Sequence, residues 1–423
     1  MRWSPRAMRR VVVDWTALRE SHDLRVLVAG NFVTGLGTQA SLVALPYQIY
    51  TQTHSAFMTG LLGAAELGPL VGMALYGGAI ADRMDRRRLL LLDQVALVAI
   101  AGALAAGAFS GHTPTWSLFV LGGLLAGFGA IQNVTRSAIV PNLVGPEHLR
   151  SALAFNFGLY QLSMVIGPGL GGLLISVAGV KAAYTADALS CLAMVAGALA
   201  LSPQPPQRSG AGEDAVNIRA SIAEGLRFVR REPALLGSFA IDLVAMTFGM
   251  PRALFAVLSL TVYHSGAAGT GALYAAVSAG ATIAALTTGW LTHARWLGRV
   301  VIGAVIAWGL AIAAAGLTTS LALACLFLAI AGAADSVSAV CRSTINQWVT
   351  PDDLRGRMSS VFSLVVTSGP RLGDIEAGSV AAAGGARFSV VSGGLACVAG
   401  VGAIVLAFPA LARFDGATQP RQT

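Results

Sequence analysis

The chain is dominated by apolar runs long enough to cross a membrane. A spanning helix needs about 20 mainly apolar residues. Twelve such runs can be placed, at about 24–49, 56–80, 89–110, 116–139, 151–176, 182–201, 234–262, 269–291, 300–317, 321–345, 358–384 and 389–412. Only 11% of the residues are charged and 55% are hydrophobic, against roughly 25% charged in a soluble domain. The sequence therefore predicts an all-α membrane protein with twelve transmembrane helices.

Basic residues are distributed unevenly between the predicted loops. Of the 28 arginine and lysine residues, only Lys181 and Arg387 fall in loops on one side, and Arg252 and Arg371 lie inside apolar runs. The others, Arg136 and Arg342 among them, are assigned to loops on the opposite side, which the positive-inside rule makes cytoplasmic. We therefore predict a multi-pass protein of the cell (inner/plasma) membrane with both termini cytoplasmic. The net charge of +8 follows the membrane in this way and does not indicate binding to nucleic acid.

Two short phrases recur about half a chain apart. Arg136-Ser137 followed by Pro146-Glu147-His148-Leu149-Arg150 recurs as Arg342-Ser343 followed by Pro351-Asp352-Asp353-Leu354-Arg355, and Gly167-Pro168-Gly169-Leu170-Gly171-Gly172 recurs as Gly369-Pro370-Arg371-Leu372-Gly373-Asp374. Two similar halves inside a membrane protein are typical of transporters that move one half against the other around a central site. We expect two parallel-related six-helix bundles, with this division: a cytoplasmic N-terminal segment (1–23), the first bundle (24–201), a cytoplasmic linker (202–233), the second bundle (234–413) and a cytoplasmic tail (414–423).

The predicted linker begins with the helix-breaking stretch Ser202-Pro203-Gln204-Pro205-Pro206. Further on, Ile218, Ile222, Leu226 and Val229 recur at helical spacing and are bordered by arginines. This pattern predicts an amphipathic helix on the cytoplasmic surface, held to anionic lipid. The alternative is a partly ordered linker helix without a specific role.

A charged loop follows the second apolar run. Gly77-Gly78-Ala79-Ile80-Ala81-Asp82-Arg83-Met84-Asp85-Arg86-Arg87-Arg88 resembles the signature loop of the major facilitator superfamily, which lies between helices 2 and 3. The resemblance implies the major facilitator fold. It also implies a gate built from Gly78, Asp82, Arg83, Arg86 and Arg87, in which Asp82 faces the positive N-terminus of helix 11 and latches the cytoplasmic side. The alternative is that these charges only set the topology.

The fifth apolar run contains Gly167, Pro168, Gly171 and Gly172, which resemble the antiporter motif of the same superfamily. Proline bends the helix and the glycines permit close packing against a partner helix. The resemblance favours export, and the alternative is a kinked, close-packed helix without directional meaning.

Three further phrases are similar to the enterobactin-exporter-like branch of the superfamily. They are Pro141-Asn142-Leu143-Val144, Ser221-Ile222-Ala223-Glu224-Gly225-Leu226-Arg227-Phe228-Val229-Arg230-Arg231-Glu232-Pro233 and Thr350-Pro351-Asp352-Asp353-Leu354-Arg355-Gly356-Arg357. That branch contains siderophore and drug exporters, so the resemblance implies efflux without naming a cargo.

Ionisable residues at membrane depth are costly and usually functional. Counting from the helix ends places Glu66, Arg252, Arg371, Asp374 and Glu376 in the outer half, and Asp242 and Asp335 in the cytoplasmic half. Arg371 and Asp374 can pair on one helix face, and Arg252 can neutralise Glu66 or Glu376, which leaves one carboxylate over. An unpaired carboxylate in a low dielectric takes up a proton readily. We therefore predict a proton-coupling site, with Glu376 as first candidate and Glu66 as second; the alternative is a static network that holds the outward gate shut.

The resemblance also implies that helices 1, 4, 7 and 10 line a central cavity. The polar residues of helices 1 and 4 are then candidates for its wall: Asn31, Thr34, Gln39, Gln132 and Asn133. Small uncharged groups of this kind suit an amphipathic organic cargo more than a sugar or a bare ion.

Motifs of other function classes are not found. The histidines fall in or near loops, and GxSxG, HExxH and GxxxxGK[ST] do not occur, so we expect no metal site, no enzyme activity, no ATP and no cofactor. A receptor or scaffold on a transporter fold would gain nothing from charges at membrane depth. We expect a secondary active transporter that uses the proton gradient for efflux of a small amphipathic organic molecule, drug or siderophore-like, by alternating access. Its expected partners are this small-molecule substrate and the lipid bilayer, and we expect a monomer; a proton-coupled importer or facilitator of a small metabolite is the alternative.

Overall fold

The computed structural model describes residues 18–415 apart from 20, 146, 205–217 and 352–353. In this described part every regular element is a helix. The first long helices are α3 (His22–Thr53), α4 (Ala56–Arg83), α5 (Arg86–Ser110), α6 (Thr115–Ile139), α7 (Leu149–Ala178) and α8 (Val180–Ala200), followed by α9 (Ile218–Arg231). The later helices are α10 (Pro233–Phe248), α11 (Leu254–Thr261), α12 (Gly266–Thr287), α13 (Leu297–Leu317), α14 (Leu321–Val349), α15 (Arg355–Gly384), α16 (Ala386–Ala407) and α17 (Pro409–Ala412), with short 3-10 turns η1 (Val140–Asn142) and η2 (Thr288–His293).

Ten of the described helices are long and apolar enough to cross a membrane, which confirms the prediction of an all-helical membrane protein. The two shorter helices α10 and α11 divide the run that was expected as one span over 234–262. Helix α15 has 30 residues, but charged residues such as Arg371 and Asp374 interrupt its apolar sequence.

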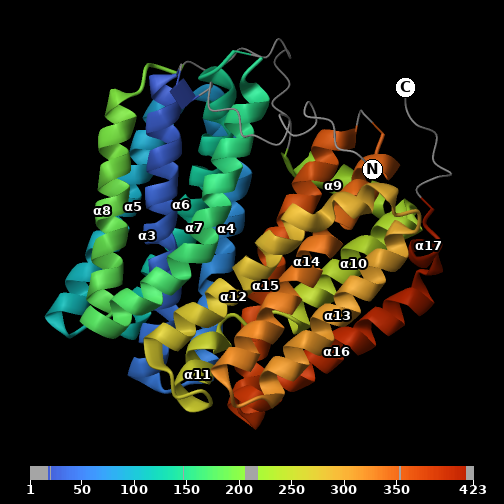
Figure 1. Ribbon diagram of the computed structural model, residues 1–423. Helices are drawn as coiled ribbons and strands as arrows, with labels where there is room; N and C mark the ends of the chain where they lie inside the picture. The colour runs from blue at the N-terminus through green and yellow to red at the C-terminus, as the bar shows by residue number, and fades with distance from the viewer. Residues whose placement is uncertain (1–17, 20, 146, 205–217, 352–353, 416–423) are drawn as a thin grey trace, which may run out of the picture.

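The helices form two groups that meet at one end. Helices α3 to α8 pack on one another, α10 to α17 pack on one another, and the strongest contacts between the groups join α4 to α15 and α7 to α12. In Figure 1 the groups meet at the lower end and diverge toward the upper end, where α9 lies. We call the end with α9 the linker side and the opposite end the far side.

The two groups repeat the same local devices on the far side. Gly179 joins α7 to α8 and Gly385 joins α15 to α16, with φ angles of 78° and 88° that favour glycine because a side chain would be strained there. Two residues after each glycine stands a basic residue. Lys181 lies 5.3 Å from the centre of the Phe109 ring, and Arg387 donates hydrogen bonds to the last carbonyl oxygens of α13. The sequence repeat is therefore also a structural repeat.

The expected helix over 234–262 is broken at residues 249–253, around Pro251. Breaking a helix in an apolar environment frees backbone groups that need other partners. Three side chains supply them: Trp308 Nε1 donates to Gly249 O at 2.9 Å, Tyr274 Oη donates to Arg252 O at 2.9 Å, and Asp374 Oδ1 accepts from the backbone N–H of Ala253 at 2.9 Å. The break is thus held by helices α12, α13 and α15.

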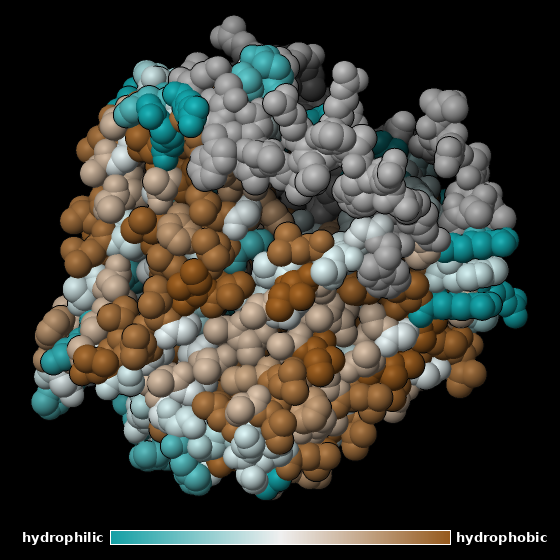
Figure 2. Space-filling model, in the orientation of Figure 1, coloured by the Kyte–Doolittle hydropathy of each residue, from teal (hydrophilic) through white to brown (hydrophobic). Residues whose placement is uncertain are grey.

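The outer face of the helices is apolar, as expected for a surface that meets lipid. Figure 2 shows hydrophobic residues covering much of the visible face, with hydrophilic residues gathered toward its upper and lower ends. Large exposed side chains such as Val177 of α7, Leu192 of α8 and Leu286 of α12 belong to this surface.

Helix α9 packs against the linker-side end of α15. Glu224 Oε1 lies 2.6 Å from Arg357 Nη1, and Gly225 is so close to α15 that a Cβ atom there would lie 2.8 Å from the Val361 side chain. The arginines Arg227 and Arg230 are exposed. The predicted linker helix therefore has one face on the second group and presents basic residues on another.

Candidate functional site

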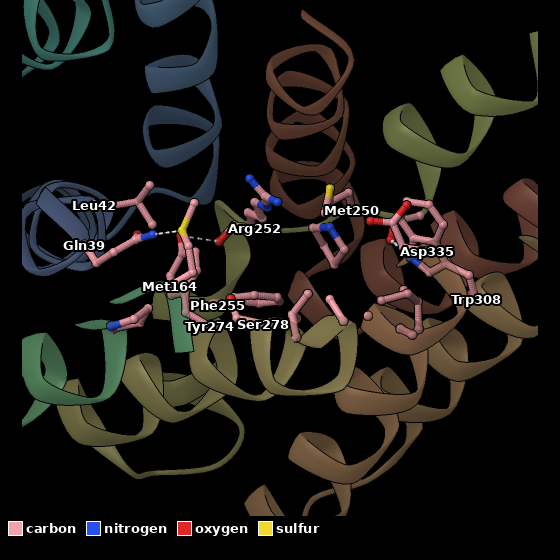
Figure 3. Close-up of a pocket in the computed structure, with 18 of the residues that line it drawn as sticks. Gln39, Leu42, Met164, Met250, Arg252, Phe255, Tyr274, Ser278, Trp308 and Asp335 are labelled. Carbon is pink, nitrogen blue, oxygen red and sulfur yellow. Dashed lines mark hydrogen bonds between the residues drawn. The ribbon is translucent and has the colours of Figure 1, made fainter. Parts of the chain in front are cut away.

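A cavity of about 190 Å³ lies where the two groups of helices meet. The first group contributes Gln39 and Leu42 from α3 and Met164 and Pro168 from α7. The second group contributes the broken segment 249–252 together with Phe255, Tyr274, Ser278, Trp308 and Asp335. Figure 3 shows these side chains around the space, with Arg252 and Asp335 set apart and Met250 between them. The cavity is mostly apolar and carries few charged groups, which is typical of binding sites for small organic molecules.

A second, smaller cavity of about 40 Å³ adjoins it toward the far side. Its charged lining residues are Glu66 of α4, Arg252, and Arg371 and Asp374 of α15. Arg252 and Tyr274 line both cavities. A polar space of this size can hold water, since one water needs roughly 10–15 Å³ of such volume.

An ion pair joins the two groups at the small cavity. Arg371 Nε lies 2.8 Å from Glu66 Oε2, and the two side chains are 17% and 15% exposed. Asp374, which spacing along the helix favoured as the partner of Arg371, instead accepts the backbone N–H of Ala253. Arg371 therefore connects α15 to α4 rather than serving a partner on its own helix.

Arg252 and Glu376 are placed differently from that pair. Arg252 has no carboxylate within 4.0 Å in the described part of the chain. Glu376 is partly exposed and lines neither of the two cavities. Of the predicted coupling residues, the structure thus brings together Glu66, Arg371, Asp374 and Arg252 and leaves Glu376 outside.

Close contacts between glycines accompany the ion pair on the far side. A Cβ atom on Gly60 of α4 would lie 2.7 Å from Gly378 Cα of α15, and one on Gly172 of α7 would lie 2.9 Å from Gly271 Cα of α12. Such distances leave no room for a side chain, so the backbones of the two groups touch directly. The far side is closed in this state by two glycine contacts in corresponding places.

Asp335 belongs to a buried charge cluster that the sequence did not predict as a unit. Arg342 of α14 lies 2.5 Å from Asp242 of α10 and 3.9 Å from Asp335.

The assignment of Arg342 and Arg136 to loops is wrong. Both lie inside helices and are buried, and Arg136 Nη2 donates to Thr34 Oγ1 at 2.8 Å. Both stand three residues before the end of their predicted runs, 116–139 and 321–345, and the positive-inside count assigned them to the adjoining loops. Their shared place in the repeated phrase was the signal that could have found them.

Of the five polar residues expected in the cavity wall, Gln39 lines the cavity. Asn31 is buried and donates to Asn156 Oδ1 at 2.8 Å. Thr34 is buried beside Arg136, Gln132 is buried, and Asn133 is exposed. These four side chains do not line either cavity in this state.

The helix-5 motif, by which we mean Gly167, Pro168, Gly171 and Gly172 of α7, acts through the shape of its helix. Cβ atoms on Gly167 and Gly171 would lie 2.6 Å from Gln39 Cβ and 2.7 Å from Ala40 Cα, both in α3. Pro168 lines the large cavity, and its carbonyl oxygen faces Gly271. The motif therefore packs α7 against α3 within its group and against α12 across the interface.

Two arginines of the signature loop tie helix ends together on the linker side. Arg86 Nη1 donates to Ala138 O of α6 at 2.7 Å, and Arg87 donates to Ala198 O and Leu199 O of α8 at 2.9 and 2.6 Å. These carbonyl groups end their helices and favour a cation. The surroundings of Gly78 and the side chains of Asp82 and Arg83 lie outside the described residues, so the latch between Asp82 and helix 11 stays a prediction.

Comparisons with known proteins agree with this architecture. The model of a family described as transmembrane secretion effectors matches residues 13–422. An enterobactin exporter of Citrobacter koseri is 28% identical over 93% of this chain and 92% of its own length, and one of Shigella boydii is 30% identical over 88% of each.

Solved transporters share the fold. A bacterial homolog of the human lysosomal transporter Spinster, in an inward-facing and unoccupied conformation, matches 93% of this chain and 96% of its own with a TM-score of 0.69 at 16% identity. A mutant of the peptide transporter POT in complex with alafosfalin matches 94% and 96% with a TM-score of 0.71 at 12% identity. At these identities the likeness concerns the fold alone.

Proposed function

Because the chain belongs to the transmembrane secretion effectors of the major facilitator superfamily, we propose that it exports a small amphipathic organic molecule from the cytoplasm by alternating access. In this proposal twelve spans form two six-helix bundles, with α10 and α11 together as the seventh span and α15 as the eleventh. The linker side is cytoplasmic, and both termini lie there. The enterobactin exporters among its relatives support a siderophore-like or drug-like cargo.

The observation that carries the proposal is a cavity between the two groups whose far side is closed. On the far side the glycine contacts and the Glu66–Arg371 pair close the interface, whereas the groups diverge toward the linker side (Figure 1). A site held between two similar halves and closed at one end fits one state of an alternating-access cycle. With the linker side inside, this state would receive cargo from the cytoplasm.

Proton coupling is part of the proposal. Glu66 stands at the closed interface and borders the small cavity. Protonation of Glu66 removes the charge that pairs with Arg371, so in the proposed cycle the protonation state of Glu66 shifts the far side between its closed and open forms. Glu376, the alternative site, has no such contact with the first group among the described interactions, so we place the coupling proton on Glu66.

Transport in liposomes tests this function. Purified protein is reconstituted, and uptake of catecholate siderophores and lipophilic cations is measured with and without an imposed pH gradient. We expect gradient-driven transport by the wild type, and cargo exchange without accumulation by Glu66→Gln, because glutamine mimics the protonated form. Glu376→Gln serves as the comparison and should keep accumulation.

Each outcome decides one part of the proposal. Full gradient-driven transport by Glu66→Gln together with its loss in Glu376→Gln would move the coupling site to Glu376. Full transport by both variants would make the network structural. Accumulation of cargo only when cargo and protons move in the same direction across the liposome membrane would favour the importer over the exporter.

A further inference from the structure

We propose that the large cavity selects a dipolar cargo, a small molecule with an acidic group at one end, an amine at the other and an apolar body between them. Arg252 would hold the acidic group and Asp335 the amine. This inference rests on the proposed transport function and adds the chemical class of the cargo.

Asp335 places an incompletely paired carboxylate in the wall of the large cavity. Its Oδ1 atom is buried and has no hydrogen-bond partner in the described part of the chain. Arg342 is 3.9 Å away and is engaged at 2.5 Å by Asp242. Two carboxylates thus share one guanidinium, and the carboxylate with the longer contact is the one that lines the cavity. A cationic group in the cavity would complete this cluster, because a charge left unpaired away from water is costly.

Arg252 places a guanidinium group in the wall of the same cavity. It lies in the break between α10 and α11. There the Tyr274 hydroxyl donates to the carbonyl oxygen of Arg252, and Asp374 accepts the N–H of the neighbouring Ala253, so the backbone is held in place. The two acids that share the small cavity with it are already engaged, Glu66 by Arg371 and Asp374 by the N–H of Ala253. The guanidinium therefore remains available to a carboxylate or a similar anion, which it can bind through two parallel hydrogen bonds.

The space between the two charges is apolar. Met250, Phe255, Trp308 and Ile312 line it, and Figure 3 shows Met250 between Arg252 and Asp335. A cargo with a single charge would leave either Arg252 or Asp335 facing an apolar cavity without a partner. A dipolar cargo satisfies both ends and fills the middle, and a volume of about 190 Å³ favours a body of about one aromatic ring.

Three matched probes test the inference. 4-(Aminomethyl)phenylacetate carries both charges at opposite ends of one ring, 4-methylphenylacetate carries only the acid, and 4-methylbenzylamine carries only the amine. Binding of the tritiated probes to purified protein in detergent is measured by equilibrium dialysis at one pH, without any gradient. We expect the dipolar probe to bind about tenfold or more tightly than either of the others, as one charge-assisted contact allows.

Two substitutions assign the ends of the probe. Asp335→Asn should reduce the affinity for the dipolar probe to that for the acid probe and leave the acid probe unaffected, while Asp335→Glu should keep the preference. Arg252→Gln should reduce the affinity for the dipolar probe to that for the amine probe and leave the affinity for the amine probe unchanged. Glu232→Gln, which removes an acid at the linker-side start of α10, is the matched control and should change none of the three affinities.

Equal binding of the three probes by the wild type would overturn the inference, and so would a dipolar preference that survives both Asp335→Asn and Arg252→Gln. The wild-type comparison decides even if a variant fails to fold. Because dialysis needs no gradient, a dipolar preference without gradient-driven transport would contradict the proposed function alone. Gradient-driven transport without the preference would contradict this inference alone.

Discussion

Arg342 Nη1 lies 2.5 Å from Asp242 Oδ1, and both side chains are only 2% exposed. In the first half of the chain, Arg136 occupies the corresponding place and donates to Thr34. In each half an arginine near the linker-side end of the fourth helix thus reaches the first helix. These contacts tie a cavity-lining helix to its neighbour within each group, so that each group can move as one body.

Removing Arg342 should destabilise the protein strongly. Arg342→Gln leaves Asp242 and Asp335 without their common cation, and breaking a buried pair in this way costs about 3–5 kcal/mol. We expect a clear fall in the thermal unfolding midpoint of the purified protein. Arg230→Gln, on the exposed face of α9, is the matched control and should stay within about 0.5 kcal/mol; equal midpoints for the two variants would show that the Arg342 cluster does not support the fold.

Loss of the pair between the groups should open the far side. Spin labels on Phe57 of α4 and Ser379 of α15, both exposed, report the separation of these helices. In Glu66→Gln we expect a larger population at long distance than in the wild type. The charge-swapped protein, Glu66→Arg with Arg371→Glu, should return toward the wild-type distribution, and a distribution unchanged by Glu66→Gln would show that the pair does not hold the interface.

Gly171 of the helix-5 motif and Gly169, two residues before it, should differ sharply in their tolerance of a side chain. Gly171→Leu would drive a side chain into the backbone of α3 at Ala40 and should abolish transport, with a stability loss of about 1–3 kcal/mol. Gly169 has open space where its Cβ atom would lie, so Gly169→Leu should transport normally. Comparable transport by the two variants, each at wild-type expression, would remove the packing explanation of the motif.

The signature loop can be tested at Asp82. If Asp82 faces the N-terminus of helix 11, Asp82→Asn should weaken the closed state of the linker side by about 0.3–1 kcal/mol without unfolding the protein. Labelling of single cysteines in the linker-side half of the cavity measures this change. Unaltered labelling together with a wild-type transport rate would leave the loop with a role in topology only.

The apolar membrane-length helices and the repeat were predictable because both depend on patterns along the chain. Apolar runs of membrane length determine where helices form, and a proline inside such a run, as Pro251 is in the seventh, is typical of a kink. That the kink is a complete break could not be read from the sequence. It depends on Trp308, Tyr274 and Asp374, which come from three other helices.

The pairing of charges was less predictable for the same reason. Spacing on α15 favours Arg371 with Asp374, because a single helix shows only its own neighbours. The structure supplies a partner from α4 instead. Burial of Arg136 and Arg342 was missed because a rule that counts arginines in loops cannot distinguish a loop arginine from one that lies a turn or two inside the helix.

The glycine contacts between α4 and α15 and between α7 and α12 determine how the far side can leak. A seal made of side chains admits small ions whenever one of them rotates aside, on the fast timescale of rotamer exchange. A seal made of backbone has no such rotations and yields only when whole helices separate. Bulky cargo and single protons would therefore be held back by the same barrier and admitted by the same slow movement, and in the proposed cycle this would keep the proton gradient from dissipating between turnovers.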